Sequence, residues 1–282
     1  MNNKGEKDMT IEELLVFGKS HCHSDHAKIL LGEIINMNPL ELLNHLNEVV
    51  EEEQVNKYKE LVLALEEGKP LQYVLGKVNF YGNTFYVDNR VLIPRFETEE
   101  LVENTINYIN KYFKEPIDII DLGTGSGVIG FTLEKKLSPK SVDLIDISKD
   151  ALEVAKINKE NLKSNANIIE NDFLDGNTKK YDLIISNPPY IMDDEEIEEV
   201  VKENEPHQAL YAGREGLDCY KKILSTCKKN MKEKSLIAFE IGPTQANDIS
   251  NLAKVYLGNV KIEVKKDLSE RDRMLFILYN LD

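Results

Sequence analysis

The segment Asp121-Leu-Gly-Thr-Gly-Ser-Gly127 decides the fold of this chain. A largely apolar run at 117–120 precedes it, and a helical apolar pattern at 128–133 follows it. Its three glycines are Gly123, Gly125 and Gly127. They therefore lie in a turn between a strand and a helix, where glycine permits a tight bend and the close approach of a ligand to the backbone.

Strand and helix patterns alternate along most of the chain, from about residue 95 onward. The candidate strands span residues 117–121, 142–146, 167–170, 183–186, 235–241, 260–264 and 274–279. Helical patterns lie between most of them, for example at 151–162, with Ser148 as the expected N-cap. This alternation predicts an α/β fold with a doubly wound, mostly parallel, seven-stranded sheet. The last two strands lack a long helical stretch between them, which predicts an antiparallel pair.

Two other patterns precede the sheet. From residue 10 to about 68, apolar side chains recur at helical spacing, which predicts a small helical domain. From 72 to 93, β-branched and aromatic residues flank Gly82-Asn83, which predicts a β-hairpin with this dipeptide as its turn. We therefore expect a helical domain at 1–70, a β-hairpin linker at 71–93 and the α/β domain at 94–282.

Composition narrows the class of protein. The 282-residue chain is 41% hydrophobic and 30% charged, which is typical of soluble globular proteins. It has no run of about 18 or more apolar residues and no apolar signal core near its start, so we expect a cytoplasmic protein. Its three cysteines fit no disulfide framework or metal knuckle. A net charge of -15 repels phosphate backbones, which favours a basic protein partner over nucleic acid.

The glycine turn has the composition of a cofactor site. Its spacing is G-x-G-x-G, and no G-K-[ST] phosphate loop lies near it, which argues against an ATP-binding loop. Asp146 ends the next candidate strand, where a carboxylate can accept hydrogen bonds from both hydroxyls of a ribose. The alternative is a purely structural turn, but the position of Asp146 favours cofactor binding.

A second motif, Asn187-Pro188-Pro189-Tyr190, directly follows the candidate strand at 183–186. An amide nitrogen is a poor nucleophile because its lone pair is delocalised. Two acceptors, the side-chain oxygen of Asn187 and the carbonyl of Pro188, can take its two N–H groups and direct that lone pair at a methyl donor. Tyr190 can stack on a flat amide or base. The alternative is a rigid turn, but its place at a strand end favours function.

Together the two motifs resemble class I methyltransferases, with a Rossmann-like fold, that act on planar exocyclic nitrogens of DNA, rRNA or protein. Further matching segments narrow this resemblance: Gln72–Gly76, Val91–Arg95, Glu97-Thr98-Glu99, Glu205-Pro206, Gly216-Leu217-Asp218 and Arg271-Asp272-Arg273. From about residue 70 to its end, the chain is similar to the peptide-chain-release-factor glutamine methyltransferases, the HemK/PrmC family. One position departs from the family pattern: Phe96 stands where the family usually has proline.

The resemblance implies an activity and its residues. The family methylates N5 of the glutamine in the Gly-Gly-Gln loop of class I release factors, using S-adenosyl-L-methionine and releasing S-adenosyl-L-homocysteine. By motif position, Gly123, Thr124, Gly125, Ser126, Gly127 and Asp146 hold the cofactor, with Phe173 near its adenine and Asn187 also beside it. Asn187, Pro188, Pro189 and Tyr190 hold the substrate glutamine, and Asn187, Pro188 and Tyr190 are the expected catalytic residues.

The same resemblance gives expectations for partners. The N-terminal helical domain would recognise the substrate, and release factors would be the protein partners of a monomeric enzyme that binds no nucleic acid stably and no membrane. Two other functions stay open at this point. One is a nucleic-acid amino methyltransferase with Tyr190 stacked on a flipped base, and the other is a non-enzymatic binding module that keeps the fold.

Three further features carry competing interpretations. The segment 193–205 holds eight acids and one base, and is either a solvated loop or a mouth that attracts a basic partner. The cluster of His21, Cys22, His23 and His26 has no second ligand group at metal spacing, so we expect no metal. Phe96 either alters the local loop or covers the methionine end of the cofactor.

Overall fold

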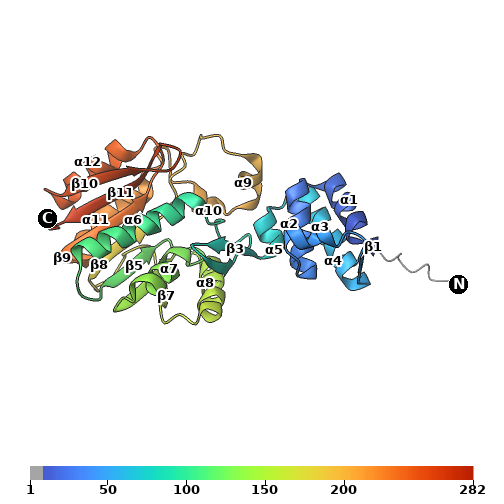
Figure 1. Ribbon diagram of the computed structural model, residues 1–282. Helices are drawn as coiled ribbons and strands as arrows, with labels where there is room; N and C mark the ends of the chain where they lie inside the picture. The colour runs from blue at the N-terminus through green and yellow to red at the C-terminus, as the bar shows by residue number, and fades with distance from the viewer. Residues whose placement is uncertain (1–8, 282) are drawn as a thin grey trace. The chain divides into compact units, whose positions relative to one another are not determined.

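The computed structural model of the protein describes residues 9–281, and the chain divides after Gly76 into two units, Met1–Gly76 and Lys77–Asp282 (Figure 1). Helices of the first unit are α1 (Ile11–His21), α2 (Ser24–Ile35), α3 (Pro39–Asn44), α4 (Glu52–Glu66) and α5 (Leu71–Leu75). Their apolar faces meet in one core around Leu14, Leu30 and Tyr58, which confirms the predicted helical region. Two short strands that the patterns did not reveal, β1 (Met9–Thr10) and β2 (Val49–Val50), pair antiparallel.

The pattern at 72–93 was interpreted wrongly in two details. Residues Leu71–Leu75 form a helix that ends at Gly76 in the left-handed conformation, despite the β-favouring Tyr73 and Val74. The hairpin then comprises β3 (Lys77–Phe80) and β4 (Asn83–Tyr86). Asn83 pairs with Phe80 across the ladder, so the turn is Tyr81-Gly82, one residue earlier than predicted. Both turn residues have positive φ, as tight hairpin loops require.

The second unit is built on a seven-stranded sheet. Its strands are β5 (Asp118–Leu122), β6 (Ser141–Asp146), β7 (Asn167–Glu170), β8 (Tyr181–Ser186), β9 (Met231–Glu240), β10 (Lys261–Lys266) and β11 (Asp272–Tyr279), in the order β10-β11-β9-β8-β5-β6-β7. The pairs from β9 to β7 are parallel, and β11 pairs antiparallel with both its neighbours. The predicted doubly wound, mostly parallel sheet with its antiparallel pair is therefore confirmed.

Helices cover both faces of this sheet (Figure 1). They are α6 (Phe96–Tyr112), α7 (Val128–Leu137), α8 (Lys149–Leu162), α11 (Asp218–Cys227) and α12 (Ala246–Leu257). Two short helices, α9 (Glu199–Asn204) and α10 (His207–Leu210), lie in the segment between β8 and α11. Successive strand residues enter different cores: Ile185 packs with α6 and α7, whereas Ile184 packs with α11 and α12. Burial on both faces explains why central strands such as β5 and β8 are largely apolar. Ser148 caps α8 as predicted, its Oγ accepting a hydrogen bond from the Ala151 N–H at 3.2 Å.

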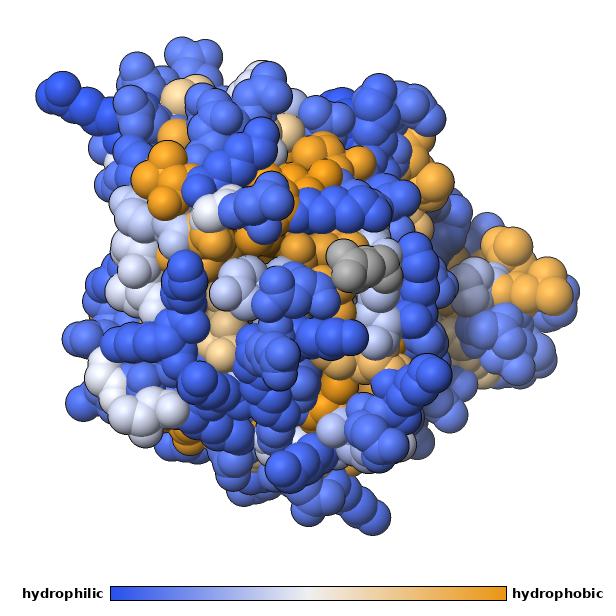
Figure 2. Space-filling view, turned by 90° about the vertical axis from the view of Figure 1, so that its left-hand side faces the viewer, coloured by the Kyte–Doolittle hydropathy of each residue, from blue (hydrophilic) through white to orange (hydrophobic). Residues whose placement is uncertain are grey.

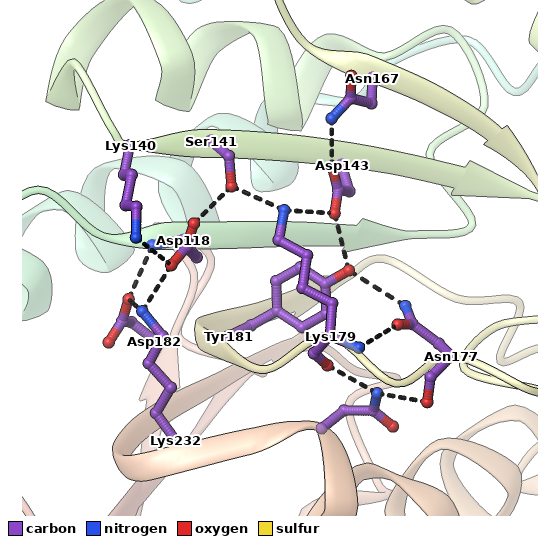
Figure 3. A network of polar contacts seen from close by, with 11 residues as sticks. Asp118, Lys140, Ser141, Asp143, Asn167, Asn177, Lys179, Tyr181, Asp182 and Lys232 are labelled. Carbon is purple, nitrogen blue, oxygen red and sulfur yellow. Dashed lines mark hydrogen bonds and ion pairs between the residues drawn. The ribbon is translucent and has the colours of Figure 1, made fainter.

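Polar side chains tie together the beginnings of five strands, β5 to β9 (Figure 3). Lys232 Nζ lies 2.6 Å from Asp118 Oδ2 and 2.7 Å from Asp182 Oδ2. Asp143 accepts hydrogen bonds from Lys179 and Tyr181, both at 2.8 Å. Figure 2 looks onto the side of the molecule where β9 begins, and hydrophilic residues cover most of it. This polar network lies where the parallel strands begin, and the candidate site lies at the opposite edge of the sheet, where they end.

We expect Lys232→Met to lower the free energy of unfolding at pH 7 by about 1–2 kcal/mol, because two carboxylates lose their cation at a partly exposed site. Burial raises the pKa of Asp118, but hydrogen bonds from Lys232 and Ser141 outweigh it and lower the net pKa. A lowered folded-state pKa stabilises the fold above the unfolded value, and that stabilisation is lost as the pH falls through the folded value.

The deficit of Lys232→Met should therefore shrink at about pH 3. Urea unfolding of both proteins at the two pH values measures it. Lys266→Met is the matched control, because within residues 9–281 Lys266 pairs only with the exposed Glu270, at 3.8 Å. An equal loss in both variants would contradict this account.

Within residues 9–281, every helix is too short or too polar to cross a lipid bilayer.

Candidate active site

The glycine turn joins β5 to α7 at the carboxyl edge of the parallel strands. Its glycines have φ values of 70°, 55° and 85°, in the left-handed region that favours glycine. The buried Asp121 holds the turn: its Oδ2 accepts hydrogen bonds from Thr124 Oγ1 at 2.6 Å and from the Gly130 N–H at 3.1 Å. Burial raises the pKa of Asp121 to about 7. Asp121 Oδ1 has no hydrogen-bond partner among the described residues.

Asp146 ends β6, the strand beside β5, and faces the same turn. Its Oδ2 accepts a hydrogen bond from the Gly125 N–H at 2.9 Å, and its Oδ1 accepts one from the Ser148 N–H at 2.9 Å. Burial raises the pKa of the Asp146 carboxyl. Each carboxylate oxygen keeps a further lone pair, so the group can still accept hydrogen bonds from a ligand.

A cavity of about 400 Å³ opens between the turn and this edge of the sheet. It has the size of ordinary small-molecule sites. Eight of the predicted site residues line it: Gly123, Thr124, Gly125, Ser126, Asp146, Phe173, Asn187 and Pro189. Nothing lies within 4 Å of a Cβ built on Gly125, so the backbone there borders open space.

Three predicted site residues, Gly127, Pro188 and Tyr190, do not line the cavity. Gly127 has a structural role in the turn. A Cβ there would lie 2.3 Å from the ring of Phe131, and its φ of 85° would strain any other residue. The remaining wall comes from the segment around Arg90 to Thr98, from α10 and its neighbours, from the beginnings of α7, α8 and α11, and from Asn171-Asp172.

Asn187 and Pro188 begin the loop after β8 and present acceptors. Asn187 Nδ2 donates to Thr98 Oγ1 at 3.2 Å. For residues 9–281, no hydrogen bond reaches Asn187 Oδ1 or the carbonyl oxygen of Pro188. The two acceptors named by the sequence argument are thus both unpaired, and Asn187 borders the cavity.

Tyr190 lies in the same loop and is held in place by hydrogen bonds and by backbone packing. Its hydroxyl accepts a hydrogen bond from Arg273 Nη1 at 3.3 Å, and its carbonyl accepts one from Gln245 Nε2 at 3.0 Å. Burial raises the pKa of Tyr190, so its hydroxyl stays neutral near pH 7. Gly216 packs against its backbone, because a Cβ there would lie 2.3 Å from the Tyr190 carbonyl oxygen. The loop is therefore held by groups from three later segments of the chain.

Glu205 anchors the C-terminal end of the acidic segment 193–205. Its buried carboxylate pairs with Arg95 and accepts a hydrogen bond from the Ile93 N–H at 3.1 Å. The segment is therefore not a simple loop: its acids are exposed up to α9, but its last one is buried.

Several functional candidates were missed by reasoning from the residue pattern. Thr98, Glu205 and Arg273 stood in matching segments, but no role was assigned to them. Glu240 and Gln245 gave no signal at all, since a single acid at a strand end and a single amide after it are common. Their roles depend on contacts between distant segments.

Two remaining features have structural partners. His21 Nδ1 lies 3.0 Å from Glu66 Oε1, and His23 caps α2 by accepting a hydrogen bond from the Asp25 N–H. In the part of the chain that the structure describes, no group of three or more His, Cys, Asp or Glu residues is placed to hold a metal ion. Phe96 is 59% exposed and does not line the cavity.

Solved structures support the fold. A methyltransferase from Pyrococcus furiosus aligns over 71% of this chain and 91% of its own, with a TM-score of 0.53 and 14% identity. The T. thermophilus 16S rRNA N2 G1207 methyltransferase, solved with AdoMet and guanosine, aligns over 72% of this chain and 50% of its own, with a TM-score of 0.53 and 13% identity. At such identities the likeness concerns the class I methyltransferase fold alone.

Sequence comparisons reach further. Residues 101–210 match the methyltransferase small domain family, and residues 23–76 match the PrmC N-terminal domain family. The release factor glutamine methyltransferase of Bacillus subtilis is 37% identical over 95% of this chain and 98% of its own length. That of Bacillus cereus is 36% identical over 89% and 90%. That of Clostridium acetobutylicum is 37% identical over 95% and 96%. Because these relatives match over almost their full lengths, the chain belongs to the release factor glutamine methyltransferase family, as its motifs indicated.

Proposed function

We propose that this enzyme transfers a methyl group from S-adenosyl-L-methionine to the side-chain N5 of a glutamine in a peptide chain release factor. One observation carries the proposal beyond family membership. Asn187 borders a cavity that the glycine turn and Asp146 also line, and both its Oδ1 and the carbonyl of the adjacent Pro188 accept no hydrogen bond from residues 9–281.

The residues of the cavity fit the cofactor. Gly125 leaves room for a ligand against its backbone, Asp146 offers carboxylate oxygens for two ribose hydroxyls, and Phe173 supplies an aromatic ring for the adenine. When bound, S-adenosyl-L-methionine supplies a methyl group on a positively charged sulfur. Gly123, Thr124, Ser126 and Asn187 complete the proposed cofactor contacts, whereas Gly127 acts by shaping the turn.

The two acceptors explain how a poor nucleophile is prepared. Hydrogen bonds from both N–H groups of the glutamine to Asn187 Oδ1 and the Pro188 carbonyl would fix the amide plane and favour positive charge on its nitrogen. Positioning then contributes most of the catalysis. No side chain has to act as a general base, because a methylated amide cation loses its proton readily to water. The neutral Tyr190 and the ring of Pro189 would hold the amide in place.

The proposed substrate is the glutamine of the Gly-Gly-Gln loop in class I release factors, bound by a monomeric enzyme. The helical domain would contribute to recognition. We infer a cytoplasmic location because release factors act on the ribosome. The exposed acids between Asp193 and α9, together with the net charge of -15, favour a basic protein partner over nucleic acid or an anionic membrane.

Incubation with methyl-labelled S-adenosyl-L-methionine tests the proposal. The acceptors are a release factor, the same factor with Gln→Ala in its Gly-Gly-Gln loop, and unmethylated DNA. We expect label in the first alone, and mass spectrometry should place one methyl group on the glutamine side chain. Label in DNA alone would replace the proposal by a nucleic-acid methyltransferase, and no label in any acceptor would favour a binding module.

A further inference from the structure

A chain of hydrogen bonds runs from the cavity into the protein interior through Thr98. Asn187 Nδ2 donates to Thr98 Oγ1 at 3.2 Å, and Thr98 Oγ1 donates to Glu240 Oε2 at 2.6 Å. The three residues come from the loop after β8, the first turn of α6 and the end of β9. Thr98 is 3% exposed and Glu240 is 2% exposed, so bulk water does not compete for these bonds.

The donor and acceptor properties of these groups fix the direction of each hydrogen bond in this series. A hydroxyl has one proton, and an ionised carboxylate can only accept. When Thr98 donates its proton to Glu240, its oxygen is left only as an acceptor for Asn187. The amide of Asn187 must then turn its nitrogen to Thr98 and its oxygen away from it. No second hydrogen bond to the Asn187 side chain exists within residues 9–281, so this contact alone sets the amide orientation.

We infer that Thr98, with Glu240 behind it, is a positioning residue that keeps the oxygen of the Asn187 amide available to an N–H of the substrate glutamine. This inference rests on the proposed function, because that function supplies the N–H. A reversed Asn187 amide would point its own NH2 group at the NH2 group of the substrate. Two donors would then face each other, and one of the two acceptors for the glutamine would be lost.

Valine and serine at position 98 separate the hydroxyl from the shape of the side chain. In Thr98→Val a methyl group replaces the hydroxyl, and we expect kcat for release factor methylation to fall about 10-fold, as for one lost orienting hydrogen bond. Thr98→Ser keeps the hydroxyl and should stay within about two-fold of wild type. The Kd for S-adenosyl-L-methionine, measured by calorimetry, should change much less than kcat in Thr98→Val, because Asn187 is one of many residues that line the cavity.

A direct measurement of the amide does not depend on activity. In the 15N-labelled protein, we expect nuclear Overhauser effects from the side-chain NH2 of Asn187 to the side chain at position 98, both in wild type and in Thr98→Ser. Slowed exchange of the same protons should accompany them, and Thr98→Val should lose this protection. Absence of these signals in wild type would overturn the inference, whatever the methylation assay gives.

Glu240→Gln provides a pH readout. Burial raises the pKa of Glu240 to about 7. Charged and titratable groups near its carboxyl are Arg273, Arg95, Glu97, Tyr190 and Tyr220. A protonated Glu240 can donate to Thr98 and so release the constraint on Asn187. In wild type, kcat should therefore rise between about pH 6 and pH 8.

Glutamine at position 240 imitates the protonated acid at every pH. We expect Glu240→Gln to have a lowered kcat that stays flat over the same range. Any pH dependence left in this variant belongs to other groups, such as Asp121. The inference fails if wild type methylates the factor but Thr98→Val keeps wild-type kcat, or if Thr98→Ser falls as far as Thr98→Val. A wild-type enzyme that labels no release factor would instead refute the proposed function.

Discussion

Asn187→Ala should lower kcat for methylation of a release factor by about 10²-fold or more, because one preorganised acceptor for the transition state is lost. The remaining acceptor, the Pro188 carbonyl, cannot fix the amide plane alone. The loss should appear in kcat, since the contact matters most as charge develops on the nitrogen. Affinity for S-adenosyl-L-methionine should fall less, because Asn187 is one of many residues that line the cavity.

Steady-state kinetics with labelled cofactor measures kcat, and calorimetry measures cofactor binding. Asn165→Ala is the matched control: it also removes an amide, but at an exposed position that does not line the cavity. Asn187→Asp keeps the shape and an acceptor but adds charge, and it cannot donate to Thr98 when ionised, so its turnover should also fall. Near-wild-type turnover of Asn187→Ala would refute the role that we assign to this residue.

Asp146→Ala should weaken the binding of S-adenosyl-L-methionine by about 10²-fold, the loss expected for hydrogen bonds to a charged acceptor. The substitution removes the proposed ribose acceptor. It also leaves the N–H groups of Gly125 and Ser148 without their 2.9 Å partner, so the glycine turn loses one support. Calorimetric titration with S-adenosyl-L-methionine and with S-adenosyl-L-homocysteine gives the two dissociation constants.

Both constants should change together, because the ribose is common to the two ligands. Asp146→Asn keeps one oxygen acceptor and should lose about 10-fold. Thermal unfolding without ligand reports how much of the effect is structural. An unchanged affinity in Asp146→Ala, in a protein that unfolds like wild type, would exclude the ribose contact.

Local patterns predicted the sheet well because both faces of its central strands are buried. Ile184 and Ile185 of β8 belong to opposite cores, so a central strand of this kind has to be largely apolar, and such runs are visible in the sequence. At Tyr73 and Val74 the β-favouring side chains predicted a strand, but the residues that flank them favour a helix. Pro70 precedes their helix and Gly76 ends it in the left-handed conformation, which favours a helical turn over a strand. Strands of two residues, such as β1, are too short to show a periodicity.

The candidate site also has a part that the sequence predicted and a part that it did not. Gly123, Asp146 and Asn187 were predictable because each ends or directly follows a strand, and the carboxyl ends of parallel strands share one edge. The partner of Asn187 was not predictable. Thr98 is 89 positions away from it, and Glu240 is 142 positions away from Thr98. No pattern of apolar residues specifies which hydroxyl meets which amide, because that choice depends on how α6 packs on the finished sheet.

The acidic segment has an anchor at each end: Tyr190 is held by Arg273 and Gln245, and Glu205 is held by Arg95 and Ile93. Insertions, deletions or charge reversals between these anchors would therefore leave the catalytic loop in place. The sequence of this stretch can therefore vary without moving the residues that are proposed to position the substrate amide. Substitutions of the exposed acids in this stretch should therefore have little effect on methyl transfer itself.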